Sequence, residues 1–240
     1  MEGITVTGIV LFAMPYKEKD RLIHIFSVEL GKITATLRGV SLPKSKLKFG
    51  GQPFCFGKFE LTGNKDFYVV KGIELIDSFY ELTADYDAYT LALSCLEVSS
   101  AVLKPNILAE GLFVNLIKTL QNIVYNNINP KLAILKFHLT VLELIGYKLN
   151  CDNCDNCGLR FIGDIKFNFD TGTFRCFNCS GGEVVGKRDF MTIKMISSTD
   201  ISRLHTLRVH DESLNAGLKI VFRDLCDRLN MKIKSLNFYE

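Results

Sequence analysis

The chain contains no tryptophan, only five prolines and no uncharged apolar run of membrane-spanning length. A helix that crosses a bilayer needs about 20 consecutive apolar residues, so such a helix is not expected. The first eight residues also lack the basic start and apolar core of a signal peptide. We therefore expect a cytoplasmic protein, whose 240 residues, 48% of them hydrophobic, can bury the core of one large domain or two ordinary ones.

Acidic residues are absent from residues 32–58, although the whole chain is nearly balanced at a formal net charge of +3. A net charge this small does not by itself indicate a nucleic-acid partner. The 32–58 segment nevertheless predicts one distinctly positive local surface. Its six basic residues are Lys32, Arg38, Lys44, Lys46, Lys48 and Lys58.

Residues 3–76 carry apolar side chains at alternate positions, interrupted by Gly, Pro or Asn, which is typical of short β-strands. The segment 29–31 and the pair Gly63-Asn64 suit turns, and Gly57 suits a β-bulge. Because closure removes exposed strand edges, we expect a small closed or nearly closed barrel. The five expected strands cover residues 4–12, 22–28, 32–38, 54–61 and 67–76.

After Tyr80 the apolar period changes to 3.6, which predicts core-facing helices. Asn129 and Pro130 are typical of a helix start, as the N-cap and the first helical residue. The expected helices cover 85–103, 107–126, 130 to near 146, and the residues after Asp211. The expected fold class is α+β, with a barrel domain (1–80), a helical domain (81–150 and 187–240) and a cysteine-rich insert (151–186).

Five of the eight cysteines crowd into residues 151–179. Four of them form two pairs, with two residues inside each pair and 18 residues between the pairs. This spacing is typical of a zinc ribbon, in which each short loop turns two thiolates toward one ion. Four thiolates complete a tetrahedral, structural site with no position open for catalysis. The expected Zn²⁺ ligands are Cys154, Cys157, Cys176 and Cys179.

Two other interpretations of the cysteines stay open at this point. Cys151 precedes the first pair at the same spacing, so Cys151, Cys154 and Cys157 also suit three ligands of an iron–sulfur cluster. Buried reduced thiols are the second alternative, but the Asp and Asn residues around the pairs are too polar for buried packing. The other three cysteines have apolar neighbours and are expected in the core: Cys55, Cys95 and Cys226.

No catalytic arrangement follows from the spacing, and we expect a protein that is not an enzyme. His210-Asp211-Glu212 matches half of a zinc deaminase signature, but both cysteine pairs lie upstream of it and neither follows a proline. The segment 181–187 imitates a phosphate-binding loop, but Arg188 replaces the required Ser or Thr.

The segment 38–48, called the basic loop below, joins the third and fourth expected strands. Lysines at alternate positions in an extended loop can line up along a phosphate backbone, each releasing counterions on binding. An ordinary solvated loop is the alternative for this segment alone. Four strand aromatics offer stacking faces for bases or pack in the core: Phe54, Phe56, Phe67 and Tyr68. The expected DNA-binding residues are Arg38, Lys44, Lys46, Lys48 and Lys32.

Several short segments, taken in order, give the chain a resemblance to the RecO family of bacterial recombination mediators over nearly its full length. They are Arg38-Gly39, Lys44-Ser45, Gly146-Tyr147, Cys154-x-x-Cys157-Gly158, Cys176-x-x-Cys179 and Lys234-Ser235. The resemblance implies an oligonucleotide-binding (OB) barrel followed by a helical domain with an inserted zinc ribbon. It also implies a nucleoid-associated DNA repair protein that binds single- and double-stranded DNA and anneals complementary strands. The implied partners are RecR and single-stranded-DNA-binding protein, with which the family loads RecA.

The chain departs from the family pattern at Gly39-Val40-Ser41, where the family commonly has another basic residue. Two rival functions follow from the same residues. A zinc-dependent hydrolase or deaminase acting on nucleic acid requires an open metal site. A protein-interaction adaptor would use the ribbon and the helices to bind partners and would not need the basic loop.

Overall fold

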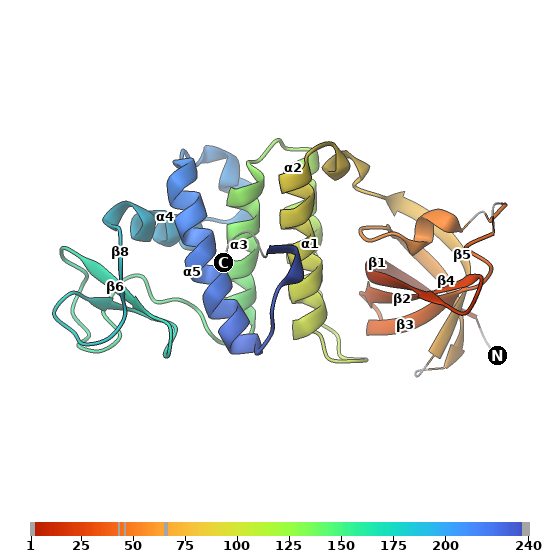
Figure 1. Cartoon of the computed structure of the whole chain (residues 1–240), viewed down its shortest axis with the longest axis horizontal. Coiled ribbons are helices and arrows are strands. Elements are labelled where there is room, and N and C mark those ends of the chain that lie inside the picture. The colour runs from red at the N-terminus through yellow and green to blue at the C-terminus, as the bar shows by residue number, and fades with distance from the viewer. Residues whose placement is uncertain (1–2, 43, 46, 65–66, 237–240) are drawn as a thin grey trace. The chain divides into compact units, whose positions relative to one another are not determined.

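The computed structural model describes residues 3–42, 44–45, 47–64 and 67–236 (Figure 1). Lys46, one of the expected DNA-binding residues, therefore lies outside the described residues. The chain divides into two compact units. Unit 1 comprises Met1–Asp85 and Leu96–Ile117, and unit 2 comprises Tyr86–Cys95 and Lys118–Glu240.

Unit 1 is built on a closed five-stranded barrel in the order β1-β2-β3-β5-β4 (Figure 1). The first part of β1 pairs with β4 and its second part pairs with β2, and the register shifts between Val10 and Phe12. A parallel contact between β3 and β5 closes the barrel. The five expected strands and the OB-like barrel are therefore confirmed. Their bounds are β1 Gly3–Tyr16, β2 Asp20–Ser27, β3 Gly31–Leu37, β4 Phe56–Asn64 and β5 Phe67–Asp77.

Alternating side chains of these strands fill the barrel, as the period-two pattern predicts. Val10, Ile25 and Phe59 are fully buried in one apolar cluster. Truncating a side chain as large as Phe59 to alanine costs about 3–5 kcal/mol, so this cluster fixes the barrel that carries the surface loops.

The fourth strand begins at Phe56, so the expected start at Phe54 was wrong. Phe54 has a left-handed backbone (φ 67°) and a buried side chain, which takes it out of the strand path. The expected bulge at Gly57 is confirmed by a register shift between Phe56 and Gly57.

Among its described residues, unit 2 contains three complete α-helices, and two further helices, α1 and α2, are divided between the units. The Asn129 side chain accepts a hydrogen bond from the Lys131 N–H at 2.9 Å, which confirms the expected cap of α3. α4 was not predicted. Within the described ranges, no helix combines the length and apolar content needed to cross a bilayer. The α-helices are α1 Tyr86–Val102, α2 Glu110–Val124, α3 Pro130–Leu144, α4 Lys187–Ser198 and α5 Asp211–Leu229, and the 3-10 helices are Lys48–Gly51, Tyr80–Ala84, Ile201–Thr206 and Lys234–Leu236.

The cysteine-rich insert forms a small antiparallel sheet in the order β7-β6-β8 (Figure 1). Its strands are β6 Ile165–Asn168, β7 Thr173–Cys176 and β8 Glu183–Val185. The expected hairpin is confirmed, and Gly172 in its turn has a left-handed backbone (φ 64°). Phe174 makes edge-to-face contacts with Phe167 and with Phe190 of α4, each at 4.9 Å between ring centroids. Aromatic packing thus holds the ribbon against α4.

Candidate metal centre and nucleic-acid interface

The sulfur atoms of Cys154, Cys157, Cys176 and Cys179 all lie within 4.8 Å of one another. The Sγ–Sγ distance is 3.7 Å for Cys154 to Cys179 and for Cys157 to Cys176, and 3.5 Å for Cys176 to Cys179. A tetrahedron with metal–sulfur bonds of about 2.3 Å has edges of about 3.8 Å. The four thiols therefore have the spacing needed to hold one metal ion.

Two tight backbone turns aim these sulfurs at a common point. In the first, the Gly158 N–H donates to the Cys154 carbonyl at 2.9 Å, and Gly158 has a left-handed backbone (φ 72°). In the second, the Cys179 N–H donates to the Cys176 carbonyl at 3.2 Å, directly after β7. The β6–β7 hairpin brings the second turn back to the first, as the sequence predicts.

The local hydrogen bonds affect the charge of Cys154 and Cys157 in opposite directions. Burial opposes ionisation of Cys154, but backbone N–H donors, beginning with that of Cys176, lower the pKa of its thiol to about 6. The Asn156 amide donates to the Cys179 sulfur at 3.3 Å. The Leu159 N–H favours the thiolate of Cys157, yet the neighbouring cysteines raise the pKa of Cys157 to about 12. Four ionised sulfurs this close require a cation between them.

Cys151 lies outside the four-sulfur group in the part of the chain that the structure describes. It is buried, and that burial raises the pKa of its thiol to about 12. This placement counts against the iron–sulfur alternative, which requires Cys151 as a ligand. Cys55 and Cys95 are buried as expected, whereas Cys226 is only partly buried.

The basic loop presents Arg38, Lys44 and Lys48 as exposed side chains. Two apolar residues hold the loop to the barrel: Val40 is buried in the core, and Leu47 packs against it. The ion pairs recorded among the described residues include none of these three cations. Their positive charge therefore remains available to an external anion.

The β1–β2 turn lies beside this loop and adds two cations that the sequence analysis missed. The Ser41 N–H donates to the Lys19 carbonyl at 3.0 Å, and the Gly39 N–H donates to Asp20 Oδ1 at 2.8 Å. These bonds place the exposed Lys17 and Lys19 next to the basic loop. The same turn also carries two carboxylates, the exposed Glu18 and the partly exposed Asp20, so its own formal charge is balanced and the net positive charge comes from the basic loop.

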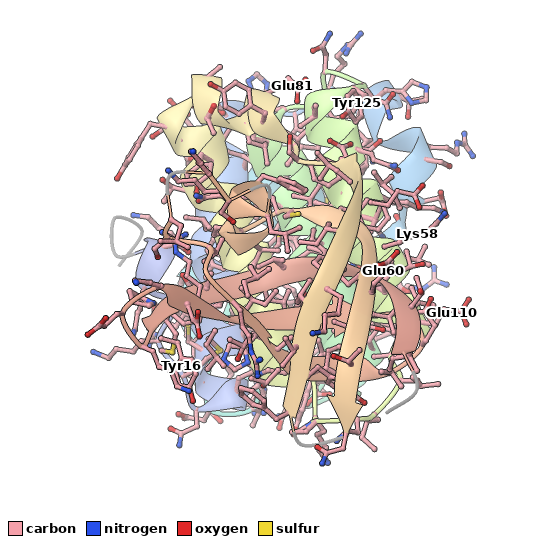
Figure 2. All side chains as sticks on the ribbon, turned by 90° about the vertical axis from the view of Figure 1, so that its right-hand side faces the viewer. Tyr16, Lys58, Glu60, Glu81, Glu110 and Tyr125 are labelled. Carbon is pink, nitrogen blue, oxygen red and sulfur yellow. The ribbon has the colours of Figure 1, made fainter. Side chains whose placement is uncertain are left out.

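Two other basic residues of the 32–58 segment are engaged elsewhere. Lys32 lies at the far end of β3 from Arg38, and its ammonium donates to the Ser100 carbonyl at 2.7 Å. Burial lowers the pKa of Lys32. Lys58 forms an ion pair with Glu74 at 3.3 Å, and Figure 2 shows Lys58 and Glu60 together on β4. The structure therefore does not bring Lys32 together with the other expected DNA-binding residues.

The four strand aromatics also separate into two groups. Phe54 and Tyr68 are buried in the core, and Phe56 packs against Phe113 at 6.1 Å between ring centroids. Phe67 is 39% exposed and is the one member of this set that faces solvent.

Comparisons with known proteins agree with this architecture. The model of the family described as "Recombination protein O N terminal" matches residues 1–79, and that described as "Recombination protein O C terminal" matches residues 83–237. A protein named DNA repair protein RecO from Acetivibrio thermocellus is 27% identical, over 99% of this chain and 96% of its own. A protein of the same name from Alkaliphilus metalliredigens is 29% identical, over 95% of each chain. With its barrel and its helical region both matched in the same order, the chain belongs to the RecO family.

Proposed function

We propose that this protein is a DNA-binding recombination mediator in DNA repair, which anneals complementary strands without covalent chemistry. The observation that carries the proposal is the cluster of exposed cations on the basic loop. This loop lies beside the β1–β2 turn, which contains Lys17 and Lys19. Relatives covering nearly the whole chain are named DNA repair proteins, which supports the same function.

Phosphate binding explains how such a surface would promote annealing. Each cation that contacts a phosphate releases condensed counterions, and this release drives binding regardless of base sequence. Two complementary strands repel one another, so a protein that neutralises phosphates and holds both strands raises their rate of encounter. We assign phosphate contact to Arg38, Lys44, Lys46 and Lys48, and we propose a structural role for Lys32 because its ammonium is bonded to the barrel unit.

We further propose that the four-cysteine group holds Zn²⁺ in a structural role. Thiolate ligands in tetrahedral spacing favour zinc over the hard cations that prefer oxygen. Four protein ligands fill the coordination sphere, whereas a catalytic zinc keeps one position for water. This donor set favours a binding protein over the rival zinc-dependent hydrolase or deaminase.

The proposed partners, RecR and single-stranded-DNA-binding protein, with RecA loaded indirectly, rest on the family resemblance. We propose that the protein acts at the nucleoid, on single-stranded DNA that is being repaired. The rival adaptor function needs protein partners but no affinity of this chain for DNA.

The test is the annealing of two complementary oligonucleotides by the full chain, followed by fluorescence quenching. Lys44→Ala with Lys48→Ala should slow annealing by about tenfold or more, since each lost phosphate contact weakens binding. Lys58→Ala is the matched control, because Lys58 is already paired with Glu74, and it should anneal like the wild type. Wild-type protein that neither binds nor anneals DNA would overturn the proposal and favour the adaptor.

A further inference from the structure

The four thiols of the metal centre differ in their access to solvent. Cys154 is 1% exposed, and Cys176 and Cys179 are partly exposed. Cys157 is exposed, and so is Gly158, the left-handed residue that follows it. A small reagent in solution therefore reaches Cys157 more readily than the other three cysteines.

Hydrogen bonds protect two of the other sulfurs. The Cys176 N–H donates to Cys154 Sγ at 3.3 Å, and the Asn156 amide donates to Cys179 Sγ at 3.3 Å. A donor that stabilises the negative charge of a thiolate also makes its sulfur less reactive toward oxidants. Cys157 receives the backbone N–H of Leu159 but, among the described residues, no recorded side-chain amide.

The Asn156 bond joins the two turns that hold the sulfurs. The first turn (154–157) reads Cys-Asp-Asn-Cys, and the second turn (176–179) reads Cys-Phe-Asn-Cys, so Asn178 occupies the place that Asn156 has in the first. Asn178 is exposed, and the hydrogen bonds recorded for the described residues give its side chain no sulfur acceptor. The two asparagines are therefore matched in sequence position and differ in their contact with a ligand.

A second sulfur lies close to the exposed one. Cys157 Sγ is 3.7 Å from Cys176 Sγ, which belongs to the other turn and stands at the end of β7. A disulfide joins its sulfurs at about 2.05 Å, so these two thiols need to approach by about 1.7 Å. A bond between them would remove two of the four metal ligands, one from each turn.

We propose that Cys157 is a modification site at which peroxides oxidise the ribbon, that Cys176 completes a disulfide with it, and that the reaction releases the metal ion. The inference rests on the proposed structural zinc and adds a response to oxidants. Burial protects Cys154 from this reaction, and the Asn156 amide protects Cys179.

The reaction has two steps, each a displacement at one atom. First, the Cys157 sulfur attacks an oxygen of hydrogen peroxide, so that an S–O bond forms, the O–O bond breaks and hydroxide leaves. The sulfur gives two electrons to the peroxide and becomes a sulfenic acid. Second, the Cys176 thiolate attacks this sulfur, so that the S–S bond forms and a second hydroxide leaves. Two thiolates and one peroxide thus give one disulfide and two hydroxides.

The product no longer suits the metal. Cys154 and Cys179 supply only two of the four thiolates that a tetrahedral site requires, and metal affinity falls with the number of ligands. The ribbon therefore loses its hold on the ion when the disulfide forms.

The test treats the zinc-loaded full chain with about one molar equivalent of hydrogen peroxide, the amount that one disulfide consumes. A chromogenic chelator follows zinc release, the remaining thiols are alkylated, and mass spectrometry locates the disulfide. We expect about one zinc ion to be released per disulfide formed, and the disulfide to join Cys157 to Cys176. Any other disulfide, or zinc that is retained after the peroxide is consumed, would overturn the inference.

A pair of variants tests the order of reactivity without changing a ligand. Asn156→Ala should release zinc about threefold faster or more and should extend oxidation to Cys179, since that sulfur loses a hydrogen bond to its negative charge. Asn178→Ala is the matched control and should release zinc at the wild-type rate. Equal rates in the two variants would contradict the protective role of Asn156.

The metal content of the untreated wild type separates this inference from the proposal beneath it. Reduced wild-type protein that binds no zinc would overturn the proposed zinc site itself. Zinc-loaded protein that fails the peroxide test would overturn the modification site alone.

Discussion

His138 shows how one buried side chain links the stability of this protein to pH. Its ring lies inside α3, with Nδ1 2.8 Å from the Ile134 carbonyl and the Phe222 ring 4.5 Å away between centroids. Burial lowers the pKa of His138 to about 3. The folded protein therefore keeps the imidazole neutral, whereas the unfolded chain protonates it near its ordinary pKa of 6.5.

This difference predicts that the protein loses stability in acid. Between pH 6.5 and 3 the unfolded state binds one more proton at His138, so the free energy of unfolding falls as pH falls, by up to about 1.4 kcal/mol per pH unit. His138→Leu should remove this contribution and flatten the dependence. Urea unfolding of both proteins between pH 7.5 and 4.5 measures it, and parallel curves would show that His138 does not contribute.

Two features of single residues could not be predicted from the sequence: the cations of the β1–β2 turn and the burial of individual phenylalanines. The basic loop was predicted because its cations stand in a stretch without acids. Lys17 and Lys19 were missed because Glu18 and Asp20 alternate with them, and only the folded turn places Lys19 beside Ser41. Phe54 and Phe67 look alike in sequence, yet one is buried and the other exposed, since side-chain direction depends on where each strand begins.

At the scale of elements, the β6–β7 turn depends on glycine for two separate reasons. Gly172 has a left-handed backbone, and a Cβ there would overlap the Arg228 guanidinium and the buried Asp224 carboxylate of α5. Gly163 is also left-handed (φ 81°) but has open space around it. The two positions separate backbone strain from packing.

Gly172→Ala should therefore destabilise the protein more than Gly163→Ala does. The Gly163 change should cost about 1 kcal/mol through backbone strain alone. The Gly172 change should cost about 2–4 kcal/mol, because a packing clash is added. Thermal unfolding measures the loss of stability in each of the two variants. Equal losses would mean that a Cβ at Gly172 does not clash with α5.

The ribbon is also the element that should depend on metal. Because four thiolates without a cation repel one another, removing the ion with a chelator should open residues 151–186 before α3. Hydrogen exchange followed by mass spectrometry measures this order.

Metal analysis should find about one ion per chain in the wild type and in Cys151→Ala, and much less in Cys154→Ser. Loss of metal from Cys151→Ala would place Cys151 among the ligands, contrary to the geometry.

Most elements followed from local pattern, and the exceptions have physical causes. Period-two strands and the capped helix α3 carry their signals in adjacent residues. β8 has only three residues, too few for a period to show. α4 was missed although its buried Phe190, Ile193 and Ile196 recur every three residues, because it begins with charged residues after a glycine. Barrel closure rests on two parallel residue pairs between β3 and β5, a contact that no local pattern contains. The four-sulfur group was predictable because ligand spacing is itself local.

At the scale of the whole molecule, charge is distributed unevenly around a small net value of +3. Residues 32–58 hold six basic and no acidic residues, whereas residues 151–186 hold three basic and five acidic residues. Four thiolates with one divalent ion would add further negative charge to the ribbon. From this distribution we expect DNA to bind at the barrel and not at the ribbon.

The most direct test of this account is a salt titration of DNA binding, measured by fluorescence anisotropy on the full chain. The logarithm of the binding constant should fall linearly with the logarithm of salt concentration in the wild type. Lys44→Ala with Lys48→Ala should reduce the magnitude of that slope by about one to two, equally for different base sequences, while Lys58→Ala leaves it unchanged. Identical slopes and affinities for the wild type and the double variant would contradict the claim that the basic loop holds the phosphates.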